Sequence, residues 1–268
     1  VYANYKAYRE YRKRYANTFK EIYETSSKII SFGDKENANK DSTLNSTKHT
    51  LIAEDSMKKL MVNFEMPREW IEAHNQGWIY IHDLSSRYLQ QINCCLFDMG
   101  NVLKNGFELN GIAYYECKTI QAAMNVGSDV ILSASANQYG GFTVPEFDKV
   151  MGPYVEKTYN KYYDFYMNEL LDKKLADKLA MERTEEQLRQ GYQGFETKLN
   201  TITSALGQIP FVTITLGLGT DKWSRMVSKC VFKTREDGLG KNKITAVFPK
   251  IVFLHRDEIN GNEKSPNF

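Results

Sequence analysis

The feature that most constrains the fold is a pair of strand-like segments separated by a helix-like one in the last third of the chain. Residues 209–218 and 244–254 are rich in β-branched and aromatic residues, and about 221–237 has a helical pattern. Strands joined through a helix are typical of parallel pairing in an α/β sheet. Pro249 has no amide donor, so the second strand is predicted to bulge or to lie at an edge there.

The length and charge of the chain limit the class of protein. Its 268 residues can bury a sizeable core as one large domain or two modest ones. The 35 lysines and arginines nearly balance the 33 acidic residues, and the net charge of +2 gives no broad positive surface for nucleic acid. The sequence has no run of 18 apolar residues that would span a membrane. We therefore expect neither nucleic acid nor a membrane among the partners.

The four cysteines, Cys94, Cys95, Cys117 and Cys230, form no C-x-x-C pair. That spacing argues against a zinc knuckle, so no metal site is expected in this segment. Adjacent Cys94 and Cys95 would make only a strained disulfide, which predicts reduced thiols in the cytoplasm. From spacing alone, core filling explains this pair better than chemistry does, and redox or radical chemistry by one thiol is the alternative.

The N-terminal region is predicted to be helical up to a short strand. Three helices are expected, over residues 2 to about 30, 51–64 and 67–77. Residues 78–84 then have the composition of a strand that ends on His82 and Asp83. These two side chains are candidates for an acid–base pair, although a histidine in that place is more often only hydrogen-bonded into position.

Two longer helices are predicted in the middle of the chain. Between Thr119 and Ala136, apolar residues recur at the three-four spacing of one helix face, and several of them are small. Such a face suits close packing against another helix, including one from a second subunit. A further helix is predicted to begin at Pro153. Its aromatic stripe, more typical of a core or an interface than of a ligand site, consists of Val155, Tyr159, Tyr162 and Tyr166.

Two glycine-rich segments lie next to the predicted strands. Residues 216–220 fall between a strand and a helix, where the backbone around Gly217 and Gly219 can hold a phosphate. Residues 237–243 fall between a helix and a strand. Neither segment matches the P-loop or the dinucleotide fingerprint, so a turn explains each of them better. The position before a helix favours only the first as a phosphate contact.

Nine segments in a fixed order give a more specific indication. They are ENANKDS (36–42), IHDL (81–84), NCCLFD (93–98), ECKTIQAA (116–123), SANQYGG (135–141), PYVEKTYNKY (153–162), GQIPFVTITLGLGT (207–220), GLGKNKITAVFPKIVF (238–253) and SPNF (265–268). In content and order they resemble the anaerobic (class III) ribonucleoside-triphosphate reductases, and the resemblance covers nearly the whole chain.

The resemblance implies the N-terminal part of a ten-stranded α/β barrel of the glycyl-radical enzyme type, with a helical N-terminal and dimer-interface region. In this family a glycyl radical creates a thiyl radical on a loop cysteine, which takes the 3′ hydrogen of a ribonucleotide. Cys94 matches a second cysteine that helps to reduce the 2′ carbon, and Asn93 matches an active-site asparagine. Cys95 is assigned to packing, because adjacent strand residues face opposite sides. Further candidates for active-site or substrate-phosphate contacts are His82, Gly217, Gly219 and Thr220.

The resemblance also implies an effector site for deoxynucleoside triphosphates or ATP at a homodimer interface. Lys118 and Lys161 match positions that contact the effector. Asp129 occupies a third such position, where the family often has glutamine, so the effector preference does not follow from the resemblance.

The parts implied by the resemblance are a helical N-terminal region (1–80), the active-site strand with the effector helices (81–204) and a strand–helix–strand segment of the barrel (205–268). The family's ATP cone, thiyl-radical loop, zinc site and glycyl-radical motif do not occur in the sequence. We therefore expect no cofactor bound directly by this segment, which alone should be inactive. The full enzyme is expected to use a glycyl radical, structural zinc and formate, after activation by a radical-SAM protein with a 4Fe-4S cluster.

Two other interpretations of the sequence are kept. The first is a catalytically inactive module that dimerises and binds deoxynucleotides. The second is another glycyl-radical enzyme, such as a relative of the formate lyases, which the SANQYGG and GLGKNKITAVFPK segments argue against.

Overall fold

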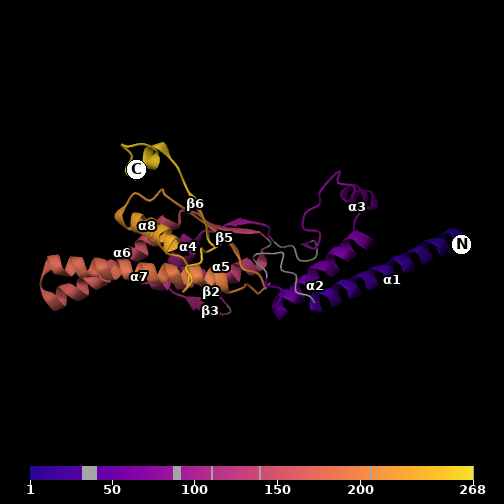
Figure 1. Ribbon diagram of the computed structural model, residues 1–268, viewed down its shortest axis with the longest axis horizontal. Helices are drawn as coiled ribbons and strands as arrows, with labels where there is room; N and C mark the ends of the chain where they lie inside the picture. Colours follow the sequence, from indigo (N-terminus) through magenta and orange to yellow (C-terminus); the bar gives the residue numbers. More distant parts are fainter. Residues whose placement is uncertain (32–40, 87–91, 110, 139, 206, 268) are drawn as a thin grey trace. The chain divides into compact units, whose positions relative to one another are not determined.

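A computed structural model describes residues 1–31, 41–86, 92–109, 111–138, 140–205 and 207–267 (Figure 1). The chain divides into two compact units. The N-terminal unit comprises residues 1–91 and 205–208, and the C-terminal unit comprises residues 92–204 and 209–268. The functional division predicted at residues 80 and 204 stays a prediction.

Helices make up the regular structure of the N-terminal unit. They are α1 (Tyr2–Ser31), α2 (Asn45–Leu60), which continues as a π-helical turn (Met61–Glu65), and α3 (Arg68–Asn75). Helices α1 and α2 pack against each other, and the ring of Phe64 contacts those of Tyr11 and Tyr15 on α1. The three predicted helices are therefore confirmed, although α2 begins six residues before the predicted residue 51.

The strand predicted over residues 78–84 does not form, so this prediction is wrong. Its backbone is held by local hydrogen bonds in place of a ladder: the Ile81 amide donates to His74 Nδ1 at 3.2 Å, and the Ser86 hydroxyl donates to the Asp83 carbonyl at 2.7 Å. Trp78 and Tyr80 remain largely exposed. β-branched and aromatic composition alone does not make a strand where no neighbouring strand supplies partners.

A four-stranded parallel sheet forms the centre of the C-terminal unit. Its strands, in spatial order, are β1 (Cys95–Leu96), β4 (Gly141–Val144), β5 (Phe211–Leu216) and β6 (Lys250–Phe253). A separate antiparallel pair consists of β2 (Phe107–Leu109) and β3 (Ile112–Tyr114). The predicted parallel α/β unit is confirmed, but its second strand begins at Lys250, six residues after the predicted residue 244. Pro249 immediately precedes β6, which lies at one edge of the sheet among the described strands.

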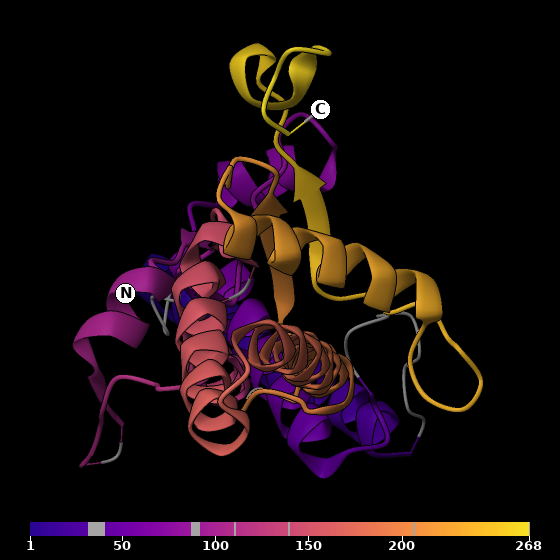
Figure 2. The same cartoon turned by 90° about the vertical axis from the view of Figure 1, so that its left-hand side faces the viewer.

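The helices of this unit are α4 (Met99–Asn105), α5 (Ile120–Ala134) with a short 3-10 turn (Ser135–Asn137), α6 (Phe147–Leu170), α7 (Lys173–Thr201), α8 (Lys222–Asp237) and a π-helical turn (Asp257–Gly261). Helices α5 to α8 pack on one another beside the sheet (Figure 2). The Thr119 side chain caps α5, and Asp221 caps α8. These caps begin the two helices close to where the sequence predicts them.

The start predicted for the next helix is wrong, because α6 begins at Phe147 and Pro153 lies inside it. Glu146 precedes the helix with a φ of +49° and is followed by Asp148 in the first turn. The proline side chain is exposed. Six helical residues precede this proline, which is therefore a poor marker of the first helical residue here.

Alternation of side chains gives the sheet two different faces. Phe142 and Val144 of β4 and Val212, Ile214 and Leu216 of β5 are fully buried in the core shared with the helices. The intervening threonines of β4 and β5, which point to the other face, are only half-buried. The core therefore lies on the helical side of the sheet. The opposite side, called the polar face for its threonines and Lys250, also carries the exposed Leu96 and Val252.

Candidate functional site

The two adjacent thiols at the first strand have different surroundings. Cys94 is exposed, and its Sγ accepts a hydrogen bond from the Gly141 amide at 3.2 Å. Cys95 is half-buried against the core, and Gln138 Nε2 donates to its Sγ at 2.8 Å. The prediction that Cys95 serves packing is confirmed. Cys94 is the thiol of the pair that a ligand can reach.

Asn93 and two glycines fix the position of this exposed thiol. The Gly140 amide donates to the Asn93 carbonyl at 2.6 Å, and Cys94 Sγ lies 3.8 Å from Asn93 Oδ1. A Cβ atom on Gly140 would lie 2.6 Å from Asn93 Oδ1 and 2.8 Å from Cys94 Sγ, so no side chain fits there. We call Asn93, Cys94, Gly140 and Gly141 the thiol site. The catalytic roles of its Asn93 and Cys94 stay predictions.

Burial separates Cys94 from the remaining cysteines. Cys117 is buried, and burial raises the pKa of its thiol. Burial is also the main cause that raises the pKa of Cys230 to about 11. A thiol held protonated in this way is a poor nucleophile. All four cysteines are free, and Cys94 is the exposed one.

The two lysines predicted to bind an effector lie on neighbouring segments. The Ile120 amide at the start of α5 donates to the Thr158 hydroxyl of α6 at 2.8 Å. Lys118 is two residues before this contact and Lys161 is three residues after Thr158, and both side chains are exposed. The structure therefore brings the two lysines to the same α5–α6 contact. Effector binding by them stays a prediction.

Asp129 does not join the two lysines within the described chain. Its carboxylate forms an ion pair with Lys198 of α7 at 2.9 Å. It lies nine residues after Ile120, which is about 14 Å along a helix. Its role as a third effector contact stays a prediction, and any such contact would compete with Lys198.

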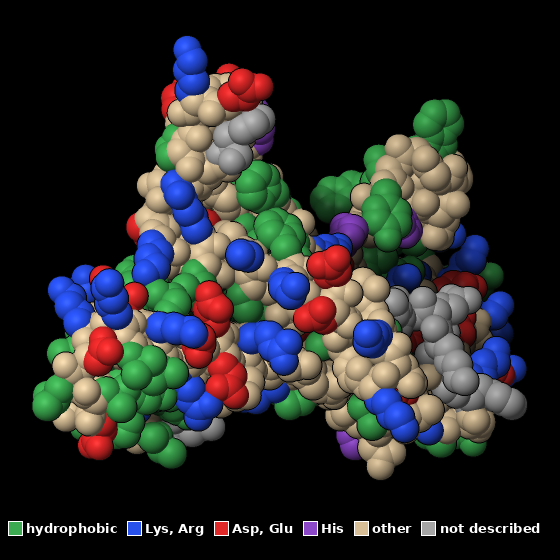
Figure 3. Space-filling model, turned by 60° about the vertical axis from the view of Figure 1, so that its left-hand side comes forward, with side chains coloured by type: hydrophobic (Ala, Val, Ile, Leu, Met, Phe, Trp, Pro, Cys, Tyr) green, Lys and Arg blue, Asp and Glu red, His purple; other side chains and the backbone are tan. Residues whose placement is uncertain are grey.

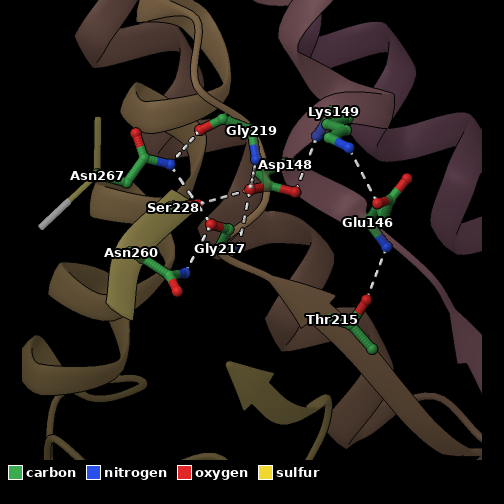
Figure 4. Close-up of polar contacts among 9 residues, drawn as sticks. All are labelled: Glu146, Asp148, Lys149, Thr215, Gly217, Gly219, Ser228, Asn260 and Asn267. Carbon is green, nitrogen blue, oxygen red and sulfur yellow. Dashed lines mark hydrogen bonds and ion pairs between the residues drawn. The ribbon is translucent and has the colours of Figure 1, made fainter. Parts of the chain in front are cut away.

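The glycine-rich turn after β5 already holds an anionic group from the chain itself. The amides of Gly217 and Gly219 donate to Asp148 Oδ2 at 3.0 and 3.2 Å, and the Ser228 hydroxyl donates to the same oxygen at 3.2 Å (Figure 4). Asp148 is fully buried. A phosphate contact at this turn stays a prediction, but it would need groups other than these two amides, such as the exposed Thr220.

Two asparagines from the C-terminal segment hold the carbonyl side of the same turn. Asn260 Nδ2 donates to the Gly217 carbonyl at 2.9 Å, and Asn267 Nδ2 donates to the Gly219 carbonyl at 2.7 Å (Figure 4). Sequence reasoning missed Asp148 and both asparagines. Each lies far along the chain from the turn, and only the quoted SPNF segment hinted that Asn267 belongs to a recurring motif.

His82 lies in the N-terminal unit, and its Nδ1 is 2.6 Å from Asp83 Oδ2. The two side chains thus pair as neighbours in an irregular segment rather than at a strand end. The histidine side chain is 66% exposed. Acid–base chemistry or a substrate contact by His82 stays a prediction.

Three further properties of the described chain concern charged surfaces, metal-binding clusters and membrane-spanning helices. On the face drawn in Figure 3, basic and acidic side chains of the described residues are interspersed. In the parts of the chain that the structure covers, no three His, Cys, Asp or Glu side chains gather where they could hold a metal ion. None of the described helices is long and apolar enough to cross a membrane.

Comparison with known proteins gives a consistent result. The family described as anaerobic ribonucleoside-triphosphate reductase matches residues 36–268. The enzyme of that name from Enterobacteria phage T4 is 36% identical over 236 residues, covering 87% of this chain and 38% of its own length. The Salmonella typhimurium enzyme is 35% identical over 242 residues, which cover 87% of this chain and 33% of that protein. The chain thus spans between a third and two fifths of these relatives.

The fold agrees as well. The crystal structure of the anaerobic ribonucleotide reductase from Thermotoga maritima in complex with dATP and CTP aligns with a TM-score of 0.53 and 14% identity, covering 87% of this chain and 43% of that one. At this identity the likeness concerns the fold alone. The four parallel strands are accordingly part of an α/β barrel of that type.

Proposed function

This chain belongs to the anaerobic ribonucleoside-triphosphate reductase family, and from that premise we propose that it supplies one active-site thiol and the effector helices to the reduction of ribonucleoside triphosphates. The observation that carries the proposal is the thiol site, where Cys94 is exposed beside Asn93 while Cys95 packs against the core. The thiol site lies at the polar face of the sheet.

The chemistry assigned to Cys94 depends on its thiol hydrogen. A thiol gives a hydrogen atom to a carbon radical more readily than other common side chains do, and the exposed Sγ is open to a ribose on the polar face. The Gly141 amide, which donates to Sγ at 3.2 Å, and the glycine at 140 keep the sulfur in one place. Asn93 Oδ1, next to the sulfur, is positioned to accept a hydrogen bond from a ribose hydroxyl.

Asn93 and Cys94 do not themselves initiate the reaction, which needs other groups of the complete enzyme. We propose that the complete enzyme uses a glycyl radical, structural zinc and formate, and that a radical-SAM protein with a 4Fe-4S cluster activates it. The described residues offer no cysteine cluster for such a zinc ion. The free thiols fit a reducing compartment such as the cytoplasm.

Regulation is proposed for the α5–α6 contact. Lys118 and Lys161 are exposed there on neighbouring segments and can bind the phosphates of a deoxynucleoside triphosphate or ATP through charge-assisted hydrogen bonds. The solved relative with dATP bound supports a nucleotide ligand for the family. We further propose that a homodimer places this contact at its interface, because Tyr159, Tyr162 and Tyr166 of α6 are only half-buried in the single chain.

Anaerobic turnover tests the proposal. The polypeptide that contains this chain is activated under anaerobic conditions and supplied with formate and ribonucleoside triphosphates, and deoxynucleotides are measured by chromatography. We expect product from the complete polypeptide and none from the 268 residues alone. Complete polypeptide that carries a normal glycyl radical and yet forms no deoxynucleotide would refute the proposed function. A control without the activating protein sets the background.

A further inference from the structure

The polar face of the sheet carries a row of three side chains that reaches across three strands. The register pairs Thr143 of β4 with Thr213 of β5, and Thr213 with Lys250 of β6. Residues paired in neighbouring parallel strands point to the same face, so the three side chains lie side by side. The next pair, Ile214 with Ile251, packs in or against the core, which directs the row to the opposite face.

The exposed thiol lies on this same face. Cys95 pairs with Phe142, whose side chain is fully buried on the helical side, and Cys95 itself packs against that core. Cys94, one residue earlier, therefore belongs to the face that carries Thr143, Thr213 and Lys250. The thiol and the row are parts of one continuous surface built by β1, β4, β5 and β6.

The members of the row are available to a ligand. Lys250 is exposed and forms no ion pair with any residue that the structure describes. The hydroxyls of Thr143 and Thr213 likewise make no hydrogen bond within the described chain, and both residues are half-buried. By contrast, the next threonine along β5, Thr215, already accepts a hydrogen bond from the Glu146 amide at 2.7 Å (Figure 4).

We propose that Lys250, with Thr143 and Thr213 beside it, binds the polyphosphate of the ribonucleoside triphosphate whose ribose lies at Cys94. This inference rests on the proposed function and adds a phosphate-binding residue to it. An ammonium group and two hydroxyls supply charge-assisted and neutral hydrogen bonds to phosphate oxygens.

The spacing favours an extended ligand over a small anion. Three strand spacings and two residues of offset put the Cα atoms of Cys94 and Lys250 about 16 Å apart on a flat sheet. The long Lys250 side chain can lean along the sheet toward Cys94 and shorten that gap. A nucleoside triphosphate can contact the thiol with its ribose and the ammonium with its phosphates at the same time, whereas formate is too small to reach both.

A lysine on an edge strand has another common use, which is to prevent pairing with other chains. That use requires a charge at the edge but no particular partners across the sheet. It also predicts no effect of Lys250 on nucleotide affinity. Steady-state kinetics therefore separates the two explanations.

The test uses the complete anaerobically activated reductase that contains this chain, with CTP as the probe. Lys250→Gln should raise the KM for CTP at least about tenfold, the usual cost of losing a hydrogen bond to a charged group. The KM for formate and the glycyl radical yield should stay unchanged, and Lys250→Arg should recover most of the affinity. Lys233→Gln is the matched control, because it removes an exposed lysine from α8 on the helical side.

Two results would overturn the inference. One is a KM for CTP in Lys250→Gln within twofold of the parent, and the other is a rise in the KM for formate in place of CTP. Calorimetry adds an independent check: Lys250→Gln should weaken CTP binding and leave cytidine, which lacks phosphates, unaffected. An equal loss for both would mean that the residue does not contact phosphate. A parent enzyme that carries its radical but makes no product refutes the proposed function, and this inference with it.

Discussion

Two pairs of glycines lie at opposite ends of the parallel sheet. Gly140 and Gly141 are at the beginning of β4, and Gly217 and Gly219 follow the end of β5. At the first pair, the missing side chain of Gly140 makes room for Asn93 and for an exposed thiol, and the Gly141 amide donates to that thiol. At the second pair, the amides are used by a buried carboxylate from α6.

The difference shows that glycine-rich sequence marks close approach rather than ligand binding. The turn after β5 has the better phosphate-site sequence, since it joins a strand to a helix, but Asp148 fills the place of the anion. The pair at the beginning of β4 has no recognised nucleotide pattern, yet it adjoins the accessible sulfur. Each pair can be tested separately.

Removal of the thiol is the most severe test of the first pair. In the complete reductase, Cys94→Ala should abolish deoxynucleotide formation and leave the glycyl radical formable, because the hydrogen donor is lost and not the radical. Cys95→Ala, its matched control, should keep most activity and destabilise the fold by about 1 kcal/mol through lost packing. Radical yield is read by paramagnetic resonance and product by chromatography. An active Cys94→Ala enzyme would contradict the assignment.

A methyl group at Gly140 should have the next largest effect. Its Cβ would lie within 2.8 Å of Asn93 Oδ1 and Cys94 Sγ, so the thiol must move. A displacement of about 1 Å at a reacting group costs about a hundredfold in rate. Gly141→Ala is the control, because its nearest neighbours are 3.9 Å away. Equal turnover of the two variants would show that the position of the sulfur is not critical.

Loss of the buried carboxylate tests the second pair. Asp148→Ala leaves the amides of Gly217 and Gly219 and the Ser228 hydroxyl without their common acceptor, and we expect a loss of about 2 kcal/mol in the free energy of unfolding. Ser228→Ala removes one of these hydrogen bonds and should cost about 1 kcal/mol. Urea titration followed by circular dichroism measures both. If Asp148→Ala is no less stable than Ser228→Ala, the carboxylate does not organise the turn.

Thiol labelling gives the mildest test, since it only ranks the cysteines of the unmodified chain. Iodoacetamide reacts with the thiolate, and a pKa of about 11 leaves about one part in a thousand of Cys230 ionised at pH 8. Exposed Cys94 should therefore be labelled first in peptide mapping. The rate at Cys230 should rise about tenfold for each pH unit up to its pKa. Faster labelling of Cys230 than of Cys94 at pH 8 would contradict the structure.

Local pattern predicts the parts of the fold whose signals are local. β5 and α8 were predictable within two residues, because alternation and an Asp221 cap lie inside the segments themselves. The segment 78–84 was not, because a strand depends on partners that sequence composition does not reveal. The helix start predicted at Pro153 was also wrong, because a proline does not show how many helical residues precede it.

Some residues of the candidate site are likewise predictable from local sequence, and others are not. The motif around Asn93 and Cys94 is contiguous, so a resemblance can find it from sequence. The contact of Asp148 with Gly217 spans 69 residues, and the row from Thr143 to Lys250 depends on strand register. Register is set by long-range pairing, and a one-residue slip would turn Lys250 toward the helices. Such neighbours become visible only in three dimensions.

The carboxylate under the second glycine pair also bears on how this part of the chain can change in evolution. Asp148 and the turn at 217–219 lie on different elements but share hydrogen bonds, so substitutions at the two places are expected to be strongly non-additive. If Asp148 is lost first, the amides of Gly217 and Gly219 remain buried without their acceptor. If the turn changes shape first, the Asp148 carboxylate remains buried without its donors. Either single substitution is expected to destabilise the fold more than a simultaneous change at both places. Helix α6 and this turn should therefore drift together across lineages as one epistatic unit.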